Sequence, residues 1–305
     1  MITIDKIRTE DNLQKICEYQ YDAFFYGTDI DDRTEAVING VSINPRYKLS
    51  FSKDNYQFSI NGREYQLIYL RDFFRDKKYR SILIDSTSLD FPEILYFLNA
   101  IGYSLYNINI KIIYVEPLEY NNIIDDDQEE CFQLSEKMHP FSALPLFAVN
   151  MQSNSSLKTV LTPFLGFENS RLGQIIINDD SATFKKITAC VSVPGYISGW
   201  ENISLKKHLK YFKTIQSELK LYPGSNPYAV TELLKELYEH HGRIIITSLG
   251  TKPTAIGISV FLVNMVKYNT LDKFVGAIYD FPIKTKGRSR GIGLIHTYKL
   301  TMRVS

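Results

Sequence analysis

Cysteine is scarce in this sequence, and neither sign of charge is in excess. The 305 residues hold three cysteines, which lie far apart and form no Cys-x-x-Cys pair: Cys17, Cys131 and Cys190. This spacing excludes a disulfide framework and the usual zinc patterns, and it is typical of a protein from a reducing compartment. Because the formal net charge is only +1, no overall field attracts DNA or RNA. A nucleic-acid partner would need a local basic patch and stays open at this point.

Long apolar runs and catalytic motifs are also missing. No stretch reaches the roughly 20 apolar residues that a membrane-spanning helix needs. The charged segment 1–14 lacks the apolar centre of a signal peptide, so we expect a cytoplasmic protein with no membrane partner. Neither Gly-x-Ser-x-Gly nor His-Glu-x-x-His occurs, and the five histidines have no metal-ligand spacing. The sequence therefore assigns no metal, cofactor or catalytic residue and leaves open whether the protein is an enzyme.

Apolar and aromatic residues, in contrast, are plentiful. Hydrophobic residues make up 44% of the chain, which contains 21 Tyr and 18 Phe. The length allows one large or two ordinary domains. Because Tyr suits sheet edges and interfaces, we expect a protein partner or a homo-oligomer.

The order of apolar segments predicts an α/β protein. Near-continuous apolar runs indicate strands buried on both faces, as in parallel sheets, over 22–27, 81–85, 110–115, 159–166, 187–193, 243–247 and 274–280. Apolar residues at helical spacing predict helices over 91–103, 204–220 and 226–242. The alternating segment 47–70 contains Asn61-Gly62, which predicts a β-hairpin, and a final strand is expected over 292–304.

Three pairs of segments look alike in the two halves of the chain and occur in the same order. FFYGTDIDDRTEAVI (24–38) matches PFLGFENSRLGQIII (163–177), SILIDSTSLDFPEILYFL (81–98) matches RIIITSLGTKPTAIGISVFL (243–262), and IIYVEPLEY (112–120) matches AIYDFPIKT (277–285). We therefore predict two Rossmann-like lobes with mainly parallel sheets and a β-hairpin insertion in the first lobe. The lobes would span 1–122 and 158–305, and the polar, acidic segment 123–157 would link them.

The repeated polar residues follow strands, which is where ligands bind in open α/β sheets. In the second half, the turn of Gly250, Thr251 and Lys252 leads into a helix that starts near Pro253. Glycine permits close backbone approach, while a hydroxyl, a positive charge and a helix N-terminus suit an anion such as phosphate. We take this turn as a candidate ligand site, and a plain strand–helix connection is the alternative, because no Walker A or Gly-x-Gly-x-x-Gly spacing is present.

The first-half counterpart of this turn consists of Asp85, Ser86 and Thr87, and it is acidic where the other turn is basic. These residues could bind ribose hydroxyls or a metal ion. They could also cap the helix that starts near Phe91, and capping is favoured for any one of them.

The strand ends of the first matched block carry further candidate ligand-binding residues, namely Gly27, Asp29 and Arg33 in the first half and Gly166, Glu168 and Arg171 in the second. Each acid–arginine pair could grip the polar edge of a ligand or form a local ion pair that holds its loop, and the ion pair is favoured. Arg288 lies in the glycine-rich basic segment 284–293. That segment could close over an anion as a lid or form a solvated turn.

The strand, GTKP turn and helix at 244–262 resemble the strand–turn–helix of CARF-type Rossmann-like domains and of the related SAVED sensors of prokaryotic antiviral systems. The resemblance covers about twenty residues, reaching Gly250, Thr251 and Lys252 and, by analogy, Ser86 and Thr87. It implies binding of a small nucleotide ligand, and since no nuclease domain is evident, a separate partner would act on the signal.

Three hypotheses follow from the sequence. The first is a Rossmann-like sensor or partner subunit in antiviral defence that binds a small anionic, nucleotide-like ligand. The second is a metal-dependent enzyme acting on a nucleotide or nucleic acid, with Asp85 and either Asp29 or Glu168 as catalytic groups. The third is a protein-interaction scaffold whose Rossmann-like core has lost its ligand.

Overall fold

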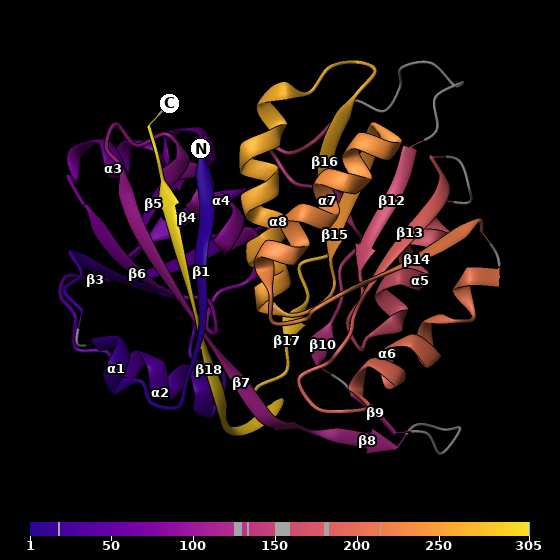
Figure 1. The fold of residues 1–305 in the computed structure, drawn as a ribbon, viewed down its shortest axis with the longest axis horizontal. Coiled ribbons are helices and arrows are strands. Elements are labelled where there is room, and N and C mark those ends of the chain that lie inside the picture. The colour runs from indigo at the N-terminus through magenta and orange to yellow at the C-terminus, as the bar shows by residue number, and fades with distance from the viewer. Residues whose placement is uncertain are drawn as a thin grey trace. The chain divides into compact units, whose positions relative to one another are not determined.

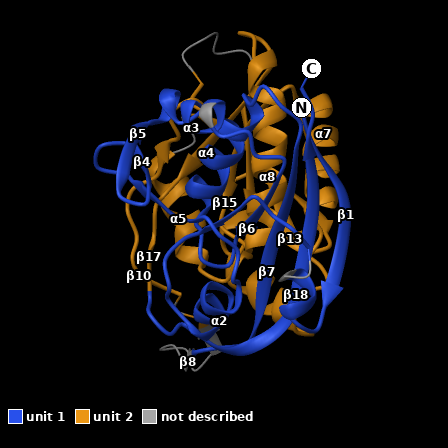
Figure 2. Ribbon diagram, turned by 90° about the vertical axis from the view of Figure 1, so that its left-hand side faces the viewer, with its two compact units in different colours: residues 1–121, 285–305 blue, residues 122–284 orange. Residues whose placement is uncertain are grey.

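The computed structural model of the chain describes residues 1–17, 19–124, 130–132, 134–149, 159–179, 183–213 and 215–304. The chain divides into two compact units, which Figure 2 shows in different colours. Unit 1 comprises residues 1–121 and 285–305, and unit 2 comprises 122–284. The sequence pattern predicts residues 285–305 in the second lobe instead. The difference arises because the final strand pairs on both sides with strands of unit 1.

Unit 1 is built on an eight-stranded mixed sheet with the strand order β1-β18-β7-β6-β2-β3-β4-β5 (Figure 1). Its strands are β1 (Ile2–Glu10), β2 (Ala23–Tyr26), β3 (Arg46–Ser52), β4 (Gln57–Ile60), β5 (Arg63–Gln66), β6 (Ser81–Asp85), β7 (Ile108–Tyr120) and β18 (Ser289–Met302). The central strands β7, β6, β2 and β3 pair in parallel, and antiparallel strands extend the sheet on both sides. β1 is not among the predicted strands, because its apolar residues alternate with polar and charged ones and form no continuous apolar run.

The predicted hairpin is confirmed between β4 and β5. Ile60 pairs with Arg63, so Asn61 and Gly62 form a two-residue turn. Their φ angles are +50° and +80°, and this left-handed backbone is the reason that Asn-Gly is favoured in such turns. β3 adds a third strand, which makes the insertion a three-stranded meander.

The helices of unit 1 are α1 (Gln14–Cys17), α2 (Asp32–Gly40), α3 (Asp72–Asp76) and α4 (Phe91–Gly102), with a 3-10 turn η1 (Leu67–Tyr69). Two of these helices, α2 and α4, begin at clear capping residues. Asp31 caps α2 by accepting a hydrogen bond from the Thr34 N–H. Asp90 and Glu93 form a capping box at the start of α4, which satisfies backbone N–H groups that have no partner within the helix. α4 is apolar nearly all round and is buried along most of its length.

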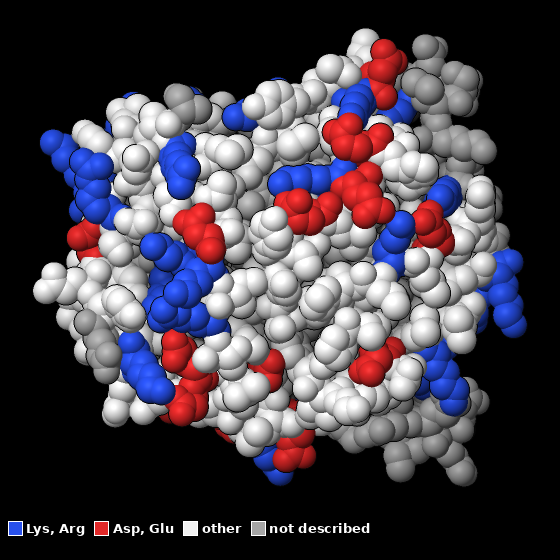
Figure 3. Space-filling view, in the orientation of Figure 1, with Lys and Arg blue, Asp and Glu red and all other residues white. Residues whose placement is uncertain are grey.

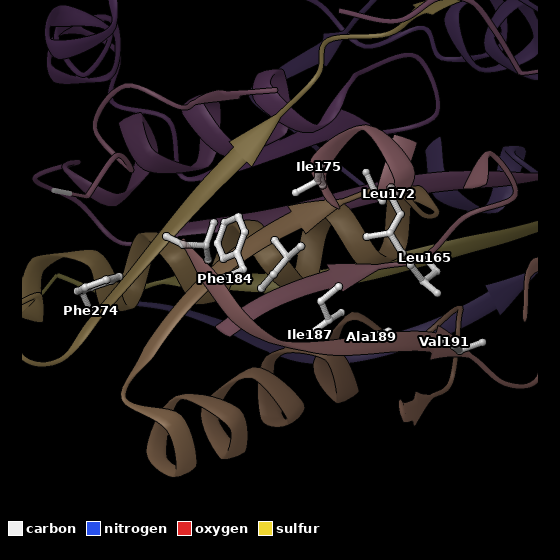
Figure 4. Close-up of a cluster of buried hydrophobic side chains, with 11 residues drawn as sticks. Leu165, Leu172, Ile175, Phe184, Ile187, Ala189, Val191 and Phe274 are labelled. Atoms are coloured by element: carbon white, nitrogen blue, oxygen red, sulfur yellow. The ribbon is translucent and has the colours of Figure 1, made fainter. Parts of the chain in front are cut away.

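Unit 2 contains a six-stranded sheet with the strand order β11-β16-β15-β12-β13-β14. Its strands are β11 (Ser142–Ala143), β12 (Thr159–Phe164), β13 (Phe184–Ser192), β14 (Ser217–Tyr222), β15 (Arg243–Ser248) and β16 (Phe274–Tyr279). All neighbours pair in parallel except β11 and β16. Figure 4 shows one side of the core, where Leu172 and Ile175 of a covering helix lie with strand residues such as Ile187.

The helices of unit 2 are α5 (Asn169–Asp179), α6 (Trp200–His208), α7 (Pro227–His241) and α8 (Lys252–Met265), with 3-10 turns η2 (Tyr211–Lys213) and η3 (Val266–Tyr268). α7 matches its prediction, since Asn226 caps it, Pro227 opens it and Gly242 ends it with a φ of +71°. The helix predicted over 204–220 is wrong in its second half. Residues 217–222 form β14, which pairs in parallel with β13.

The segment expected as a linker contributes short strands to unit 2. β10 (Ser135–Lys137) pairs with β17 (Ile283–Lys284), and β8 (Asn122–Ile124) pairs with β9 (Glu130–Phe132). Part of the expected linker, 125–129, 133 and 150–157, lies outside the described residues, and so does most of the acidic run.

The two sheets share a four-strand order. Unit 1 contains the parallel series β7-β6-β2-β3, and unit 2 contains the parallel series β16-β15-β12-β13. The three matched sequence blocks fall on corresponding members, since β2 and β12, β6 and β15, and β7 and β16 occupy the same places in the two series. The carboxyl ends of the matched strands therefore meet at one edge of the sheet in each unit.

Candidate functional site

Two strand ends of unit 1 lie side by side. The Gly27 N–H donates to the Ser88 hydroxyl at 2.7 Å, and the Thr28 N–H donates to the Ser88 carbonyl at 3.2 Å. A Cβ on Gly27 would stand 2.3 Å from that carbonyl oxygen, which is far inside contact distance. Gly27 is therefore required by the close approach of the two turns, independently of any ligand.

The polar residues Asp85, Ser86 and Thr87 are at most 1% exposed, and their side chains bond within unit 1. The Asp85 carboxylate accepts from the Thr87 N–H and the Ser88 hydroxyl, Ser86 donates to the Ile113 carbonyl, and Thr87 accepts from a backbone N–H of β7. Burial raises the pKa of Asp85 to about 6 despite the hydrogen bonds that favour its ionised form. These side chains hold the turn and do not reach solvent.

Arg33 forms an ion pair with a different acid from the one predicted. Its guanidinium lies 2.6 Å from Asp31 and donates to the Val115 carbonyl, whereas Asp29 accepts from the Thr34 hydroxyl. Burial disfavours the ionised form of Asp31, but the charge and hydrogen bond of Arg33 outweigh it and lower the pKa of Asp31. The Asp29–Arg33 pair is wrong because Asp31, at the start of α2, lies nearer the buried guanidinium.

The corresponding strand ends of unit 2 approach each other even more closely. The Leu249 N–H donates to the Phe164 carbonyl at 2.9 Å. A Cβ on Gly166 would stand 2.0 Å from the Leu249 carbonyl oxygen, and one on Gly250 would stand 3.0 Å from the Leu165 carbonyl oxygen. The turns that carry Gly166 and Gly250 are thus in direct backbone contact, as the equivalent turns are in unit 1.

Arg171 also has a partner that local spacing does not indicate. Its guanidinium makes two bonds to the Asp280 carboxylate, at 2.5 and 2.7 Å, and lies over the Tyr279 ring at 5.6 Å. Glu168 instead accepts from the Ser135 hydroxyl and a neighbouring N–H, so the Glu168–Arg171 pair is wrong. In both units the arginine reaches the residue that follows the matched tyrosine of β7 or β16.

The turn of Gly250, Thr251 and Lys252 forms the start of α8. Thr251 is the N-cap residue, and its hydroxyl contacts the Thr254 hydroxyl at 3.1 Å and donates to the Gly224 carbonyl at 3.4 Å. Lys252 opens the helix and is partly exposed. The N-terminal end of a 14-residue helix and a cationic side chain therefore lie at one turn, which is the arrangement expected for binding an anion.

The basic stretch around Arg288 is tied to the rest of unit 1 by hydrogen bonds of backbone N–H groups. The Gly287 N–H donates to the Ile30 carbonyl, the Asn121 N–H donates to the Arg288 carbonyl, and the Gly291 N–H donates to Asp32. These bonds hold the turn against the start of α2, which favours a fixed turn over a lid that opens.

A cavity of about 410 Å³ lies elsewhere in unit 1, on the strands β1, β18 and β7. In Figure 3, Lys and Arg side chains gather on the part of unit 1 where β1 and β18 lie. The cavity is lined by four basic residues, two tyrosines and several uncharged polar groups, which include Lys6, Arg8, Lys111, Lys299, Tyr19, Tyr21, Gln20, Ser81 and Asn109. Ser81 and Asn109 stand at the amino ends of β6 and β7, so this cavity is at the opposite end of those strands from the predicted site.

Three lysines of the cavity form a row across the sheet. Lys6 of β1 is directly opposite Lys299 of β18, and Lys299 is directly opposite Lys111 of β7. Side chains of directly opposed residues share one face, with Cβ atoms about 5 Å apart, and like charges in such positions destabilise a sheet. The row therefore costs folding free energy unless an anion occupies the cavity.

The middle of the cavity disfavours positive charge. Burial lowers the pKa of Lys111, and the charges of Arg8 and Lys299 add to this effect, although Glu10 opposes it. The Lys111 ammonium lies 4.3 Å from the centre of the Tyr19 ring, a distance at which a cation is attracted to the ring face. A bound anion would relieve the repulsion among these groups.

The sequence does not indicate this cavity, because its basic residues come from segments near 6, 111 and 299 that have no common motif. The available signal is the alternation of side chains along β1, which puts Lys6 and Arg8 on one face, together with the position of Lys299 in the final strand. Only strand pairing reveals that these faces coincide.

Comparison with known proteins finds no family model and no curated protein that matches the sequence. Within the described residues, no group of three or more His, Cys, Asp or Glu is placed to hold a metal ion. In the same part of the chain, no helix has the length and apolar character to cross a membrane.

Proposed function

We propose that the protein consists of two Rossmann-like lobes and binds a small anionic, nucleotide-like ligand, and that the basic cavity of unit 1 holds the anionic part of that ligand. The lobes are supported by the shared parallel orders β7-β6-β2-β3 and β16-β15-β12-β13. A role as a sensor or partner subunit in antiviral defence is supported by the resemblance of residues 244–262 alone.

The observation that carries the binding proposal is the row of Lys6, Lys299 and Lys111 across three adjacent strands. A protein gains no stability from three opposed lysines in an empty cavity. Arg8 adds a fourth cation at the same wall. Four cations around one small cavity suit a ligand with several negative charges, such as a polyphosphate group.

The remaining lining indicates a ligand that is more than an inorganic anion. Tyr19 is 52% exposed and Tyr21 is partly exposed, so both rings can contact a flat group. Gln20, Ser81 and Asn109 add uncharged donors and acceptors. The cavity volume falls within the range of about 300–1,000 Å³ that is usual for small-molecule sites, and a nucleotide combines a polyanion with a flat ring.

Isothermal titration calorimetry with ATP and with inorganic tripolyphosphate tests the proposal. The double variant Lys111→Met/Lys299→Met should bind ATP roughly 100-fold more weakly, since a hydrogen bond to a charged group is worth about 1.5–3 kcal/mol. Lys48→Met, which changes an exposed lysine of β3 in the same sheet, is the matched control and should bind as the wild type does.

The same titration separates the rival interpretations. Loss of binding in Lys252→Met but not in the double variant would move the site to the start of α8. Release of phosphate or of cleaved nucleotide during the titration would favour the enzyme hypothesis. Absence of binding for both probes in a wild-type protein that co-purifies with a partner would favour the scaffold.

A further inference from the structure

Among the described residues, one edge of the unit 2 sheet has no further strand paired to it. β14 is the last strand in the order β11-β16-β15-β12-β13-β14, with β13 as its single strand neighbour among the described residues, and Figure 1 shows it at the margin of that sheet. Leu219 is 42% exposed and Leu221 is 63% exposed. An exposed edge strand that carries apolar residues is a template for pairing with another strand, and proteins usually block such edges.

The backbone of β14 shows which of its groups face outward. The Gln216 carbonyl accepts from the Ile187 N–H, and the Tyr222 carbonyl accepts from the Val193 N–H, so these even-numbered residues direct their backbone groups toward β13. Backbone groups alternate along a strand. Ser217, Leu219 and Leu221 therefore present their N–H and C=O groups to the open edge.

The charged residues of β14 alternate with these outward-facing positions. Glu218 and Lys220 project on one face of the sheet, opposite Thr188 and Cys190 of β13, while Leu219 and Leu221 project on the other. Glu218 lies 2.6 Å from Lys186, and Lys220 lies 3.1 Å from Glu236 of α7. The side chains of Glu218 and Lys220 are both partly exposed, with about a third of each accessible to solvent.

We propose that β14 pairs antiparallel with β14 of a second copy of this chain, in the register that places Leu219 opposite Leu219 of the other copy. In this register Ser217 is opposite Leu221, and all the outward N–H and C=O groups of Ser217, Leu219 and Leu221 are paired. The two six-stranded sheets become one continuous sheet across a two-fold axis.

Charge selects this register over its neighbours. With Leu219 on the two-fold axis, Glu218 of each copy lies opposite Lys220 of the other, which gives two complementary pairs. A shift that pairs Ser217 with Leu219 puts Glu218 opposite Glu218, and a shift that pairs Leu219 with Leu221 puts Lys220 opposite Lys220. The order Glu-Leu-Lys is self-complementary in one antiparallel register only, which favours a second copy as the partner.

Analytical ultracentrifugation of the full chain over a wide concentration range tests the dimer. Wild type should dimerise, and Lys220→Glu, which places Glu opposite Glu twice, should raise the dissociation constant at least about tenfold. The exchange Glu218→Lys/Lys220→Glu restores complementarity and should restore the dimer. Lys235→Glu makes the same charge change on the exposed face of α7 and is the matched control that should dimerise normally.

Three further variants test the dimer without changing the charge of β14. Leu219→Pro removes an outward N–H and no bond to β13, so it should give a folded monomer. Leu219→Cys should form a disulfide-linked dimer on mild oxidation, because opposed residues in this register have Cα atoms about 5.5 Å apart. Leu221→Cys, which is opposite Ser217, should not. A monomeric wild type at all concentrations, or a Lys220→Glu protein that dimerises like the wild type, would overturn the proposal.

Discussion

The lysine row of unit 1 should make the ligand-free protein less stable than it would be without Lys299. This residue has a lysine opposite it on each side. At an assumed separation of about 7 Å, two ammonium groups in water repel by about 0.6 kcal/mol, so two such pairs would cost about 1 kcal/mol. Lys299→Met keeps the apolar stem of the side chain and removes both repulsions, and it should raise the free energy of unfolding by about that amount.

Urea denaturation at two ionic strengths measures this effect. The gain should be largest near 0.01 M salt, where the screening length is about 30 Å, and should vanish near 1 M, where it is about 3 Å. Because the single Trp lies in unit 2, unfolding of unit 1 is better followed by hydrogen exchange of the β1 and β18 amides. Lys48→Met should show no such gain.

Adding tripolyphosphate should reverse the sign of the difference. If the cavity binds the anion as proposed, the wild type should bind it more tightly than Lys299→Met and should gain more stability from a saturating concentration. If Lys299→Met is more stable than the wild type without the anion and less stable with it, the lysines repel one another in the free protein and bind the anion. If Lys299→Met is less stable at low salt without anion, the repulsion argument is refuted.

Further outcomes concern pH and backbone packing. Burial lowers the pKa of His208 to about 4 from its ordinary 6.5, so its contribution of about 3 kcal/mol is present above pH 6.5 and lost as pH falls toward 4; His208→Asn should flatten this fall in unfolding experiments. Asp85 acts in the opposite direction, because its folded pKa of about 6 exceeds its ordinary 3.8. Its contribution to the free energy of unfolding is present below pH 3.8 and is lost as pH rises through 6. Asp85→Asn should abolish this pH dependence. Gly27→Ala should lower the melting temperature far more than Gly40→Ala, since a Cβ at 27 meets the Ser88 carbonyl oxygen at 2.3 Å, whereas one at 40 makes only an ordinary contact with Leu13 at 3.6 Å; equal losses would contradict the packing argument.

Local sequence patterns predicted the central strands and α7 well. Runs such as SILID and RIIIT are buried on both faces in parallel sheets, and this environment admits few polar residues. The caps of α7 are equally local, since Asn226, Pro227 and Gly242 act within one turn of the helix ends. Such features depend on neighbouring residues and are therefore readable from the chain alone.

The error over residues 204–220 arose because two periods overlap there. Leu205, Leu209 and Leu219 fit helical spacing, but Leu219 and Leu221 also alternate with charged residues as a strand requires. Pairing with β13 decides in favour of the strand, and that contact is not encoded in local spacing.

The contacts within the candidate sites were likewise not predictable from local sequence. The sequence located the strand-end turns but not the partners of their arginines, because Asp280 is 109 residues from Arg171. The basic cavity depends on pairing among β1, β18 and β7, which are distant in the chain. Its electrostatic character becomes visible only when those strands are aligned.

The position of β18 has a consequence for how the protein is made. β18 fills the place between β1 and β7, and the N-terminal amine bonds to the Arg303 carbonyl at 2.8 Å. During synthesis, all of unit 2 leaves the ribosome before residues 289–302 do. Unit 2 can therefore fold first, whereas β1 can pair only after β18, its one neighbour among the described strands, has been made, and the lysine row forms last.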